Sequence, residues 1–278
     1  MRLGVMFDRD LPPERLVPFA QALDSRVDDL WVVEDLGWTG GLTSAAAALA
    51  STSRLRVGLG IAPAPLRNPM LLAMEFANLA RMFPGRFVGG VGHGVQEWMR
   101  QVGAAAPSPL ALLEETITAV RGLLRGESVT MDGRSVRLDE VRLVHPPAVV
   151  PPVVAGVKSP RSLALSGRVA QGTILPEGFG PEAIGPALER ICAAGEHELI
   201  VFTHLCVDDP AGLDGIREEV ASFLEVDRAE VFAADGSPAQ AAAAVKALWA
   251  AGASTVVLRP VGDDPLSPVE KLLSALHR

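Results

Sequence analysis

Two adjacent carboxylates and one histidine stand just beyond short apolar runs, where side chains could take part in acid–base chemistry. Glu34 and Asp35 follow the apolar run at 29–33, and His93 follows the run at 87–91. Because successive residues of a strand point to opposite sides, one carboxylate can face a site that the other does not. Burial raises the pKa of a carboxyl group toward the range useful in general acid–base catalysis. The alternatives are a helix cap or solvated turn for the carboxylates and a polar loop position for His93.

Glycine and proline mark two stretches where the backbone could lie against a flat ligand. Residues 58–69 alternate small and apolar residues with prolines, and residues 89–94 set His93 among glycines. A residue without Cβ lets the backbone approach a ring closely, and prolines fix the exit of the loop. A rigid strand–helix turn is the alternative for the first stretch. The glycines at 89–94 do not have the spacing of the dinucleotide-binding fingerprint, which argues against a Rossmann fold.

An anion-binding position is indicated at residues 156–162. Ser159 is a good N-cap residue and Pro160 a good first helical residue. The start of a helix offers free N–H groups and the positive end of the helix dipole, and Lys158 and Arg161 add charge beside it. The pattern therefore predicts a place for a phosphate group, with a well-capped helix and solvated cations as the alternative.

Eight short apolar runs, separated by helical patterns, must position these side chains. The runs occupy residues 3–7, 29–33, 57–62, 87–91, 153–156, 172–175, 199–207 and 255–258. Most are continuous rather than alternating, as expected for parallel strands covered on both sides. Eightfold alternation over 278 residues predicts a TIM (β/α)8 barrel, an α/β fold in which function lies on the loops after the strands. An open doubly wound sheet is the alternative. His204, inside the run at 199–207, is interpreted as a core residue.

One segment interrupts the alternation of strands and helices. Residues 128–138 have the pattern of a hairpin that turns at Asp132-Gly133, and a proline-stiffened stretch leads from it into the run at 153–156. Residues 126–152 are too few for a core of their own. The sequence thus predicts a single domain over residues 1–278, with 126–152 as a small hairpin insertion.

Composition excludes several classes of function. The net charge is −8 and the 25 basic residues are scattered, whereas nucleic-acid binding needs a basic stripe. No apolar run is long enough to span a membrane, and no signal peptide is recognised, so a cytoplasmic location is expected. The histidines lack metal-ligand spacing, no G-x-S-x-G elbow occurs, and Lys158 is the one lysine at a strand end. These absences indicate chemistry supplied by an organic cofactor rather than by a metal or a nucleophile.

Three motifs together resemble the luciferase-like monooxygenase superfamily, and most closely its coenzyme F420-dependent branch. The first runs from Val57 through Gly60 to Pro69, the second covers residues 84–94, and the third covers 155–172. The hairpin and the proline-rich stretch after it are also similar to that family. The resemblance is good over residues 1–175 and weak beyond them.

The resemblance implies a barrel that binds F420 or FMN at its mouth and pairs as a homodimer. Gly60 and Ile61, followed by Ala62, would flank a non-proline cis peptide that supports the cofactor ring. His93 and Gly94 would line the site of the ring. The cofactor phosphate would meet the segment formed by Gly156, Val157, Lys158 and Ser159.

The chain departs from this family pattern at two positions. Many F420 enzymes have Asp-His where Glu34-Asp35 stand, and Gln171 replaces a common aspartate. The proton-transfer role is therefore expected to fall to Asp35, Glu34 or His93.

Three functions follow from these expectations. The first is an oxidoreductase that transfers a hydride between F420 and a small organic substrate. The second is an FMN-dependent monooxygenase that uses O2 and receives reduced flavin from a partner flavin reductase. The third is a noncatalytic flavin-binding protein, which the replaced histidine and the shortened tail would fit.

Overall fold

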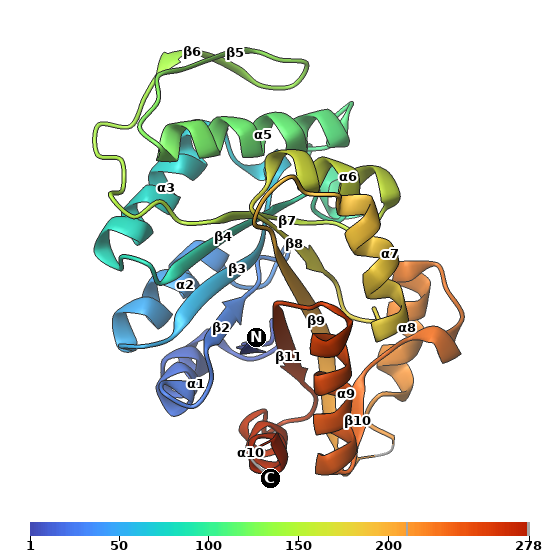
Figure 1. Cartoon of the computed structure of the whole chain (residues 1–278). Helices are drawn as coiled ribbons and strands as arrows, with labels where there is room; N and C mark the ends of the chain where they lie inside the picture. Colours follow the sequence, from blue (N-terminus) through green and yellow to red (C-terminus); the bar gives the residue numbers. More distant parts are fainter. Residues whose placement is uncertain (210, 277–278) are drawn as a thin grey trace.

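Eight parallel strands close into a barrel in the computed structural model, which describes residues 1–209 and 211–276. The strands are β1 (Arg2–Met6), β2 (Asp29–Val32), β3 (Arg56–Pro63), β4 (Phe87–Gly92), β7 (Val153–Gly156), β8 (Gly172–Leu175), β9 (Glu198–Val207) and β11 (Thr255–Pro260). They pair in this order, and β11 pairs back with β1 to complete the circle (Figure 1). A short strand, β10 (Ala234–Gly236), extends the sheet beside the end of β9. The predicted (β/α)8 barrel is confirmed.

Helices connect the strands and cover the outside of the barrel. They are α1 (Leu16–Leu23), α2 (Gly41–Ser51), α3 (Pro69–Met82), α4 (Gln96–Gln101), α5 (Pro109–Leu124), α6 (Pro160–Val169), α7 (Pro181–Ile191), α8 (Asp214–Leu224), α9 (Pro238–Ala251) and α10 (Leu266–Leu276). Their apolar stripes are buried against the strands, as with Leu72, Phe76 and Leu79 of α3. This outer layer forms the largest apolar cluster of the protein. Among the described residues, no helix is both long and apolar enough to span a bilayer.

The middle of the barrel is filled by a second apolar cluster. Its buried members are Met6, Trp31, Val88, Val154, Ile174, Ile200, Phe202 and Val257. The rings of Trp31 and Phe202 meet edge to face, with centroids 5.4 Å apart. A Cβ at Gly58 would lie 2.5 Å from the Trp31 ring, and a Cβ at Gly60 would lie 2.7 Å from Phe202. These two glycines therefore make room for aromatic side chains inside the barrel.

Polar side chains stand above and below this apolar middle. Since every second strand residue faces inward, the strands that bury Met6, Trp31, Phe202 and Val257 also direct other residues of the same parity into the barrel. At the amino ends of the strands these residues are Arg2, Asp29, Arg56, Glu198 and Thr255, here named the floor cluster. At the carboxyl ends they are Asp8, Asp35, His204 and Arg259.

The segment after α5 forms an antiparallel hairpin of β5 (Val129–Asp132) and β6 (Arg137–Val141) that lies over α5 (Figure 1). The carboxylate of Glu115 on α5 accepts hydrogen bonds from three successive backbone amides at the hairpin tip, at 2.7–2.8 Å. Apolar residues of the hairpin, Val136 and Leu138, form a small cluster with Ala119. The hairpin is thus held against one side of the barrel by both apolar packing and backbone hydrogen bonds.

Candidate active site at the carboxyl ends of the strands

A buried ionic network lies across the carboxyl ends of β1, β8, β9 and β11. Arg259 donates to Asp8 at 2.5 Å and to Glu177 at 3.3 Å, and all three side chains are mostly buried. His204 lies beside Arg259 in the register of β9 and β11 and is only 4% exposed. Burial by itself would raise the pKa of Asp8, but the guanidinium of Arg259 holds that pKa below its usual value. The carboxylate is therefore charged at neutral pH.

A second ion pair continues this network toward β2. Arg9 donates to Asp35 at 2.8 Å, and its guanidinium lies 4.6 Å from the ring centre of Trp38. Glu219 of α8 approaches Arg9 from the other side at 3.6 Å. We call the whole group the mouth cluster: Asp8, Arg9, Asp35, Glu177, His204, Glu219 and Arg259.

The two adjacent carboxylates at the end of β2 take different positions. Asp35 has the parity of the inward-facing residues and joins the mouth cluster. Glu34 is directed to the other side, where it accepts hydrogen bonds from Arg67, at 2.8 Å from Nη2, and from the backbone N–H of Gly41 at 3.0 Å. Gly41 is the first residue of α2. Glu34 thus fixes the start of a helix, whereas Asp35, paired with Arg9, is the carboxylate of the two that faces the mouth.

His93, at the end of β4, carries an unsatisfied polar atom. Its Nδ1 is buried and has no hydrogen-bond partner among the described residues. Burial lowers the pKa of His93, and a hydrogen bond with the backbone of Pro109 acts in the opposite direction. The imidazole is therefore neutral near pH 7, the form that can accept a proton or bind a donor from a ligand.

The side chain of Ile61 lies over glycines of the next two strands of the barrel, β4 and β7. A Cβ at Gly92 would lie 2.9 Å from the Ile61 side chain, and a Cβ at Gly156 would lie 2.6 Å from it. The peptide bond between Gly60 and Ile61 is cis. Within β3 the flanking Leu59 and Ala62 are fully buried, whereas Gly60 and Ile61 are partly exposed. Solvent therefore reaches the apolar surface of Gly60 and Ile61, near the carboxyl end of β3.

The start of α6 follows β7 directly and is well capped. The hydroxyls of Ser159 and Ser162 are 2.8 Å apart, and Pro160 is the first helical residue. Lys158 points to α8 instead, where its amine donates to the backbone oxygen of Phe223 at 2.7 Å. Arg161 is exposed and has no ionic or hydrogen-bond partner among the residues that the structure describes. It is therefore the cation available to an anion at this helix start.

The remaining predicted residues line the site through their backbone. Val157 and Ala62 are buried, and Ala62 belongs to the outer core. Gly94 has a positive φ of 67°, which favours glycine, and a Cβ there would lie 3.0 Å from Pro63. Gly92 and Gly156 are paired in register, so the ends of β3, β4 and β7 lie side by side.

These features fit a planar cofactor with an anionic tail. The partly exposed surface of Gly60 and Ile61 suits the face of a ring, and the half-buried, neutral imidazole of His93 suits a polar edge. The α6 start with Arg161 suits a phosphate and begins four residues beyond the Gly156 strand end.

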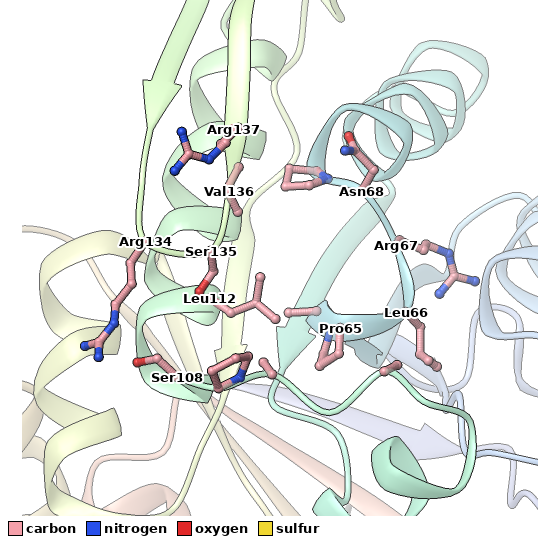
Figure 2. A pocket seen from close by; sticks show the side chains of 15 residues that line it. Pro65, Leu66, Arg67, Asn68, Ser108, Leu112, Arg134, Ser135, Val136 and Arg137 are labelled. Carbon is pink, nitrogen blue, oxygen red and sulfur yellow. The ribbon is translucent and has the colours of Figure 1, made fainter.

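A cavity of about 590 Å3 lies beside this mouth, under the tip of the hairpin (Figure 2). Its lining comes from the turn after β3 at 64–69, the stretch 104–108 before α5, and the hairpin tip at 134–137. In Figure 2 Leu112 and Pro65 project toward the cavity, whereas Arg134 and Arg137 extend to its outer side. None of the residues predicted for the site lines this cavity. Arg67, which binds Glu34, forms part of the wall next to the mouth.

The mouth cluster contains residues that the sequence analysis did not single out. Asp8, Glu177 and Arg259 were not predicted, and His204 was interpreted as a core residue. The inward parity of Met6 and Asp8, or of Phe202 and His204, was the signal that could have found them.

The chain is similar in sequence to one protein family and to several known enzymes. A family model described as luciferase-like monooxygenase matches residues 5–212. A 5,10-methylenetetrahydromethanopterin reductase of Methanolobus tindarius is 25% identical over 274 residues, which cover 97% of this chain and 78% of the relative. An F420-dependent glucose-6-phosphate dehydrogenase of Nakamurella multipartita is 34% identical over 136 residues, which cover 48% of this chain and only 40% of the relative.

Among solved structures, the chain is similar to the coenzyme F420-dependent tetrahydromethanopterin reductase from Methanopyrus kandleri. The TM-score is 0.83 at 18% identity, and the match covers 99% of this chain and 98% of the other. At this identity the similarity supports the fold, which agrees with the closed barrel described above.

Proposed function

Because the chain belongs to the luciferase-like monooxygenase family, we propose that it is an oxidoreductase that transfers a hydride between F420 and a small organic substrate. The observation that carries the proposal is the partly exposed Gly60–Ile61 surface, whose isoleucine side chain lies against the glycine ends of β4 and β7. When bound, F420 supplies the hydride acceptor or donor. The protein must orient the ring and handle the accompanying proton.

Ring orientation is assigned to Gly60, Ile61, His93 and Gly94. Ile61 provides an apolar surface for one face of the ring, since its side chain is propped on Gly92 and Gly156. Ala62, Gly156 and Val157 shape the backbone around it. The phosphate is assigned to the start of α6, at Ser159 and Arg161, whereas Lys158 contributes through its contact with α8.

Proton transfer is assigned to Asp35 or His93. Oxidation of an alcohol removes a hydride from carbon and a proton from the hydroxyl, and the proton needs a base within hydrogen-bond reach. His93 is neutral, and its imidazole is half-buried at the end of β4. Asp35 is held by Arg9 at the edge of the mouth. Glu34 acts on this pair indirectly, by fixing the start of α2.

A parallel titration with F420 and FMN tests the proposal. We expect F420 to bind, and we expect Gly156→Ala to weaken binding about tenfold or more, because the new Cβ displaces Ile61. Gly185→Ala is the matched control, since nothing lies within 4 Å of its added Cβ. Binding of FMN alone, together with O2 consumption when a flavin reductase is supplied, would support the monooxygenase instead.

Turnover separates the enzyme from a noncatalytic flavin-binding protein. We expect Asp35→Asn or His93→Gln to lower kcat about 10²-fold or more while F420 still binds, because one of them carries the proton. If F420 binds to the parent protein and to both variants but none of the three consumes substrate, the noncatalytic protein is favoured.

We also propose that the chain pairs as a homodimer through α3. Leu71, Met74 and Met82 are exposed apolar residues on one face of this helix, with Asn78 between Met74 and Met82. Exposed apolar side chains grouped on one face of a protein surface commonly mark an interface. Met74→Glu should yield a monomer in sedimentation analysis, whereas Val144→Glu, at an exposed apolar position off the helix, should not.

A further inference from the structure

We infer that the substrate at this mouth is an uncharged alcohol or carbonyl compound with an apolar body, and that phosphorylated and carboxylated substrates are excluded. The inference rests on the proposed function, because it concerns the substrate of the same site. It is carried by the balance of charges in the mouth cluster and by the apolar surface beside it.

The mouth cluster has an excess of negative charge. Four carboxylates face two guanidinium groups, which leaves a net charge of −2. His204 adds no positive charge at neutral pH, because burial lowers its pKa. An anionic group entering the mouth therefore meets a field of its own sign in a partly buried site, where repulsion is weakly screened.

Neither guanidinium of the mouth cluster is free to bind an anion. Arg259 is held between Asp8 and Glu177. Arg9 is held between Asp35 and Glu219, and it also lies against Trp38. A phosphate that binds Arg259 would displace Asp8 or Glu177, and one that binds Arg9 would compete with Asp35. Each of these mostly buried carboxylates would then lose its cation, which is costly, whereas the exposed Glu219 can move aside without such a cost.

The neighbouring cations are engaged as well. Arg67 pairs with Glu34 and Glu75, and Lys158 donates to the backbone of α8. Arg161 is unpartnered within the described part of the chain, but it stands at the α6 start assigned to the cofactor phosphate. A second phosphate at the mouth thus has no cation of its own.

Apolar surface is available for the body of the substrate. Val33 is only partly buried at the upper end of the inner core, beside the Ile61 surface assigned to the cofactor ring. At the rim Trp38 is 44% exposed, and its ring lies 5.8 Å from that of Trp98. These surfaces favour a compound whose carbon skeleton can be desolvated, with one hydroxyl or carbonyl group for the exchange.

This inference separates the chain from one of its relatives. The Nakamurella relative is named for a phosphorylated sugar, yet the aligned residues cover only 40% of it. The mouth described here offers that phosphate no free cation among the described residues.

Pairs of substrates that differ by one anionic group test the inference with the F420-loaded protein. Cyclohexanol and 4-hydroxycyclohexanecarboxylate form one pair, and glucose and glucose 6-phosphate form another, with F420 reduction followed by absorbance. We expect kcat/KM for the neutral member to exceed that of the anionic member at least about tenfold. The double variant Glu177→Gln, Glu219→Gln should reduce this ratio about tenfold, whereas Glu114→Gln, which leaves Arg168 elsewhere on the surface without its partner, should not change it.

Direct calorimetric titration of glucose 6-phosphate decides the inference without turnover or cofactor. We expect no binding at the mouth, so any heat should persist in Arg259→Met and vanish in Arg161→Met. Binding that is lost in Arg259→Met, or an anionic substrate that outperforms its neutral partner, would overturn the inference while F420 binding leaves the proposed function intact. Failure of F420 to bind would overturn the proposed function. The calorimetry would still show whether the mouth binds an anionic compound.

Discussion

The two ends of the barrel both carry buried ionic clusters, but they are built differently. In the floor cluster two arginines meet two carboxylates, so the formal charge is zero. Arg56 binds Asp29 and Glu198 at 2.6 Å each, and Thr255 donates to Glu198 at 2.6 Å. In the mouth cluster the carboxylates outnumber the guanidinium groups, and the longer pairs are 3.3 and 3.6 Å.

This difference indicates that the floor cluster has a structural role and that the mouth cluster belongs to a functional site. Asp29 in the floor cluster is 0% exposed and has a full set of charged partners. Burial would raise the pKa of Glu198, yet hydrogen bonds from Arg56 hold it below the usual value. In the mouth cluster His204 is buried without a positive charge, and its neighbours carry the surplus. Saturated pairs fix the floor, whereas unbalanced pairs leave the mouth able to respond to a ligand.

The largest expected effect comes from removing the central cation of the floor. Arg56→Met leaves Glu198 without its ion-pair partner and the fully buried Asp29 with Arg2 alone, so the free energy of unfolding should fall by about 3–5 kcal/mol. Urea denaturation followed by circular dichroism measures this loss. Arg2→Met, which removes a more exposed partner of Asp29, should cost less. A loss below about 1 kcal/mol for Arg56→Met would show that the floor cluster does not hold the barrel closed.

The corresponding change at the mouth should cost less stability. Arg259→Met leaves Asp8 and Glu177 unpaired, but their side chains are 17% and 16% exposed, so neither is as completely shut off from solvent as Asp29 in the floor cluster. We expect the free energy of unfolding to fall by about 1–2 kcal/mol in the same urea experiment. A loss equal to that of Arg56→Met would remove the distinction between the two ends.

The sequence predicted the strands better than the clusters that the strands carry. Continuous apolar runs identify buried parallel strands locally, and all eight were found. The pair of Asp8 and Arg259 joins residues 251 positions apart, so no local pattern reveals it. His204 was assigned to the core because its neighbours in the sequence are apolar. Only the closed barrel shows that His204 on β9 stands beside Arg259 on β11.

The glycines of β3 show a second limit of sequence reasoning. A glycine in a strand indicates close approach, but it does not say what approaches. At Gly58 the neighbour is the Trp31 ring, and at Gly60 it is Phe202. At Gly92 and Gly156 it is Ile61, the residue predicted to face the cofactor. The predicted residues thus lie together, but part of the space that their glycines open is filled by the protein itself.

The pH dependence of the free energy of unfolding gives an effect of intermediate size by which the mouth can be compared with the floor. Burial lowers the pKa of His204 below the ordinary value of about 6.5 that it has in the unfolded chain. The unfolded chain therefore binds the proton more readily than the folded protein. The contribution of neutral His204 to the free energy of unfolding is complete above about pH 6.5, and it declines as the pH falls toward the pKa that His204 has in the folded protein. His204→Gln should reduce the slope of unfolding free energy between pH 7 and 5 by up to about 1.4 kcal/mol per pH unit.

Charged groups around His204 and two other histidines also affect the pH dependence of stability. Glu177, Asp8 and Glu219 favour its charged form, and Arg259 opposes it. His93 and His197 have lowered pKa values of their own, so a residual slope should remain in the variant. An unchanged slope in His204→Gln would mean that this histidine does not distinguish the mouth from the floor.

The smallest expected effect isolates charge from stability. Glu219 is 76% exposed and lies 3.6 Å from Arg9, so Glu219→Gln should change the free energy of unfolding by less than about 0.5 kcal/mol. The same substitution reduces the excess negative charge of the mouth cluster by one. If the relative use of an anionic substrate rises in Glu219→Gln while the unfolding curve stays in place, the charge surplus acts on the ligand and not on the fold. If the unfolding curve shifts as far as it does in Arg259→Met, the carboxylates of the mouth are structural in the same sense as those of the floor.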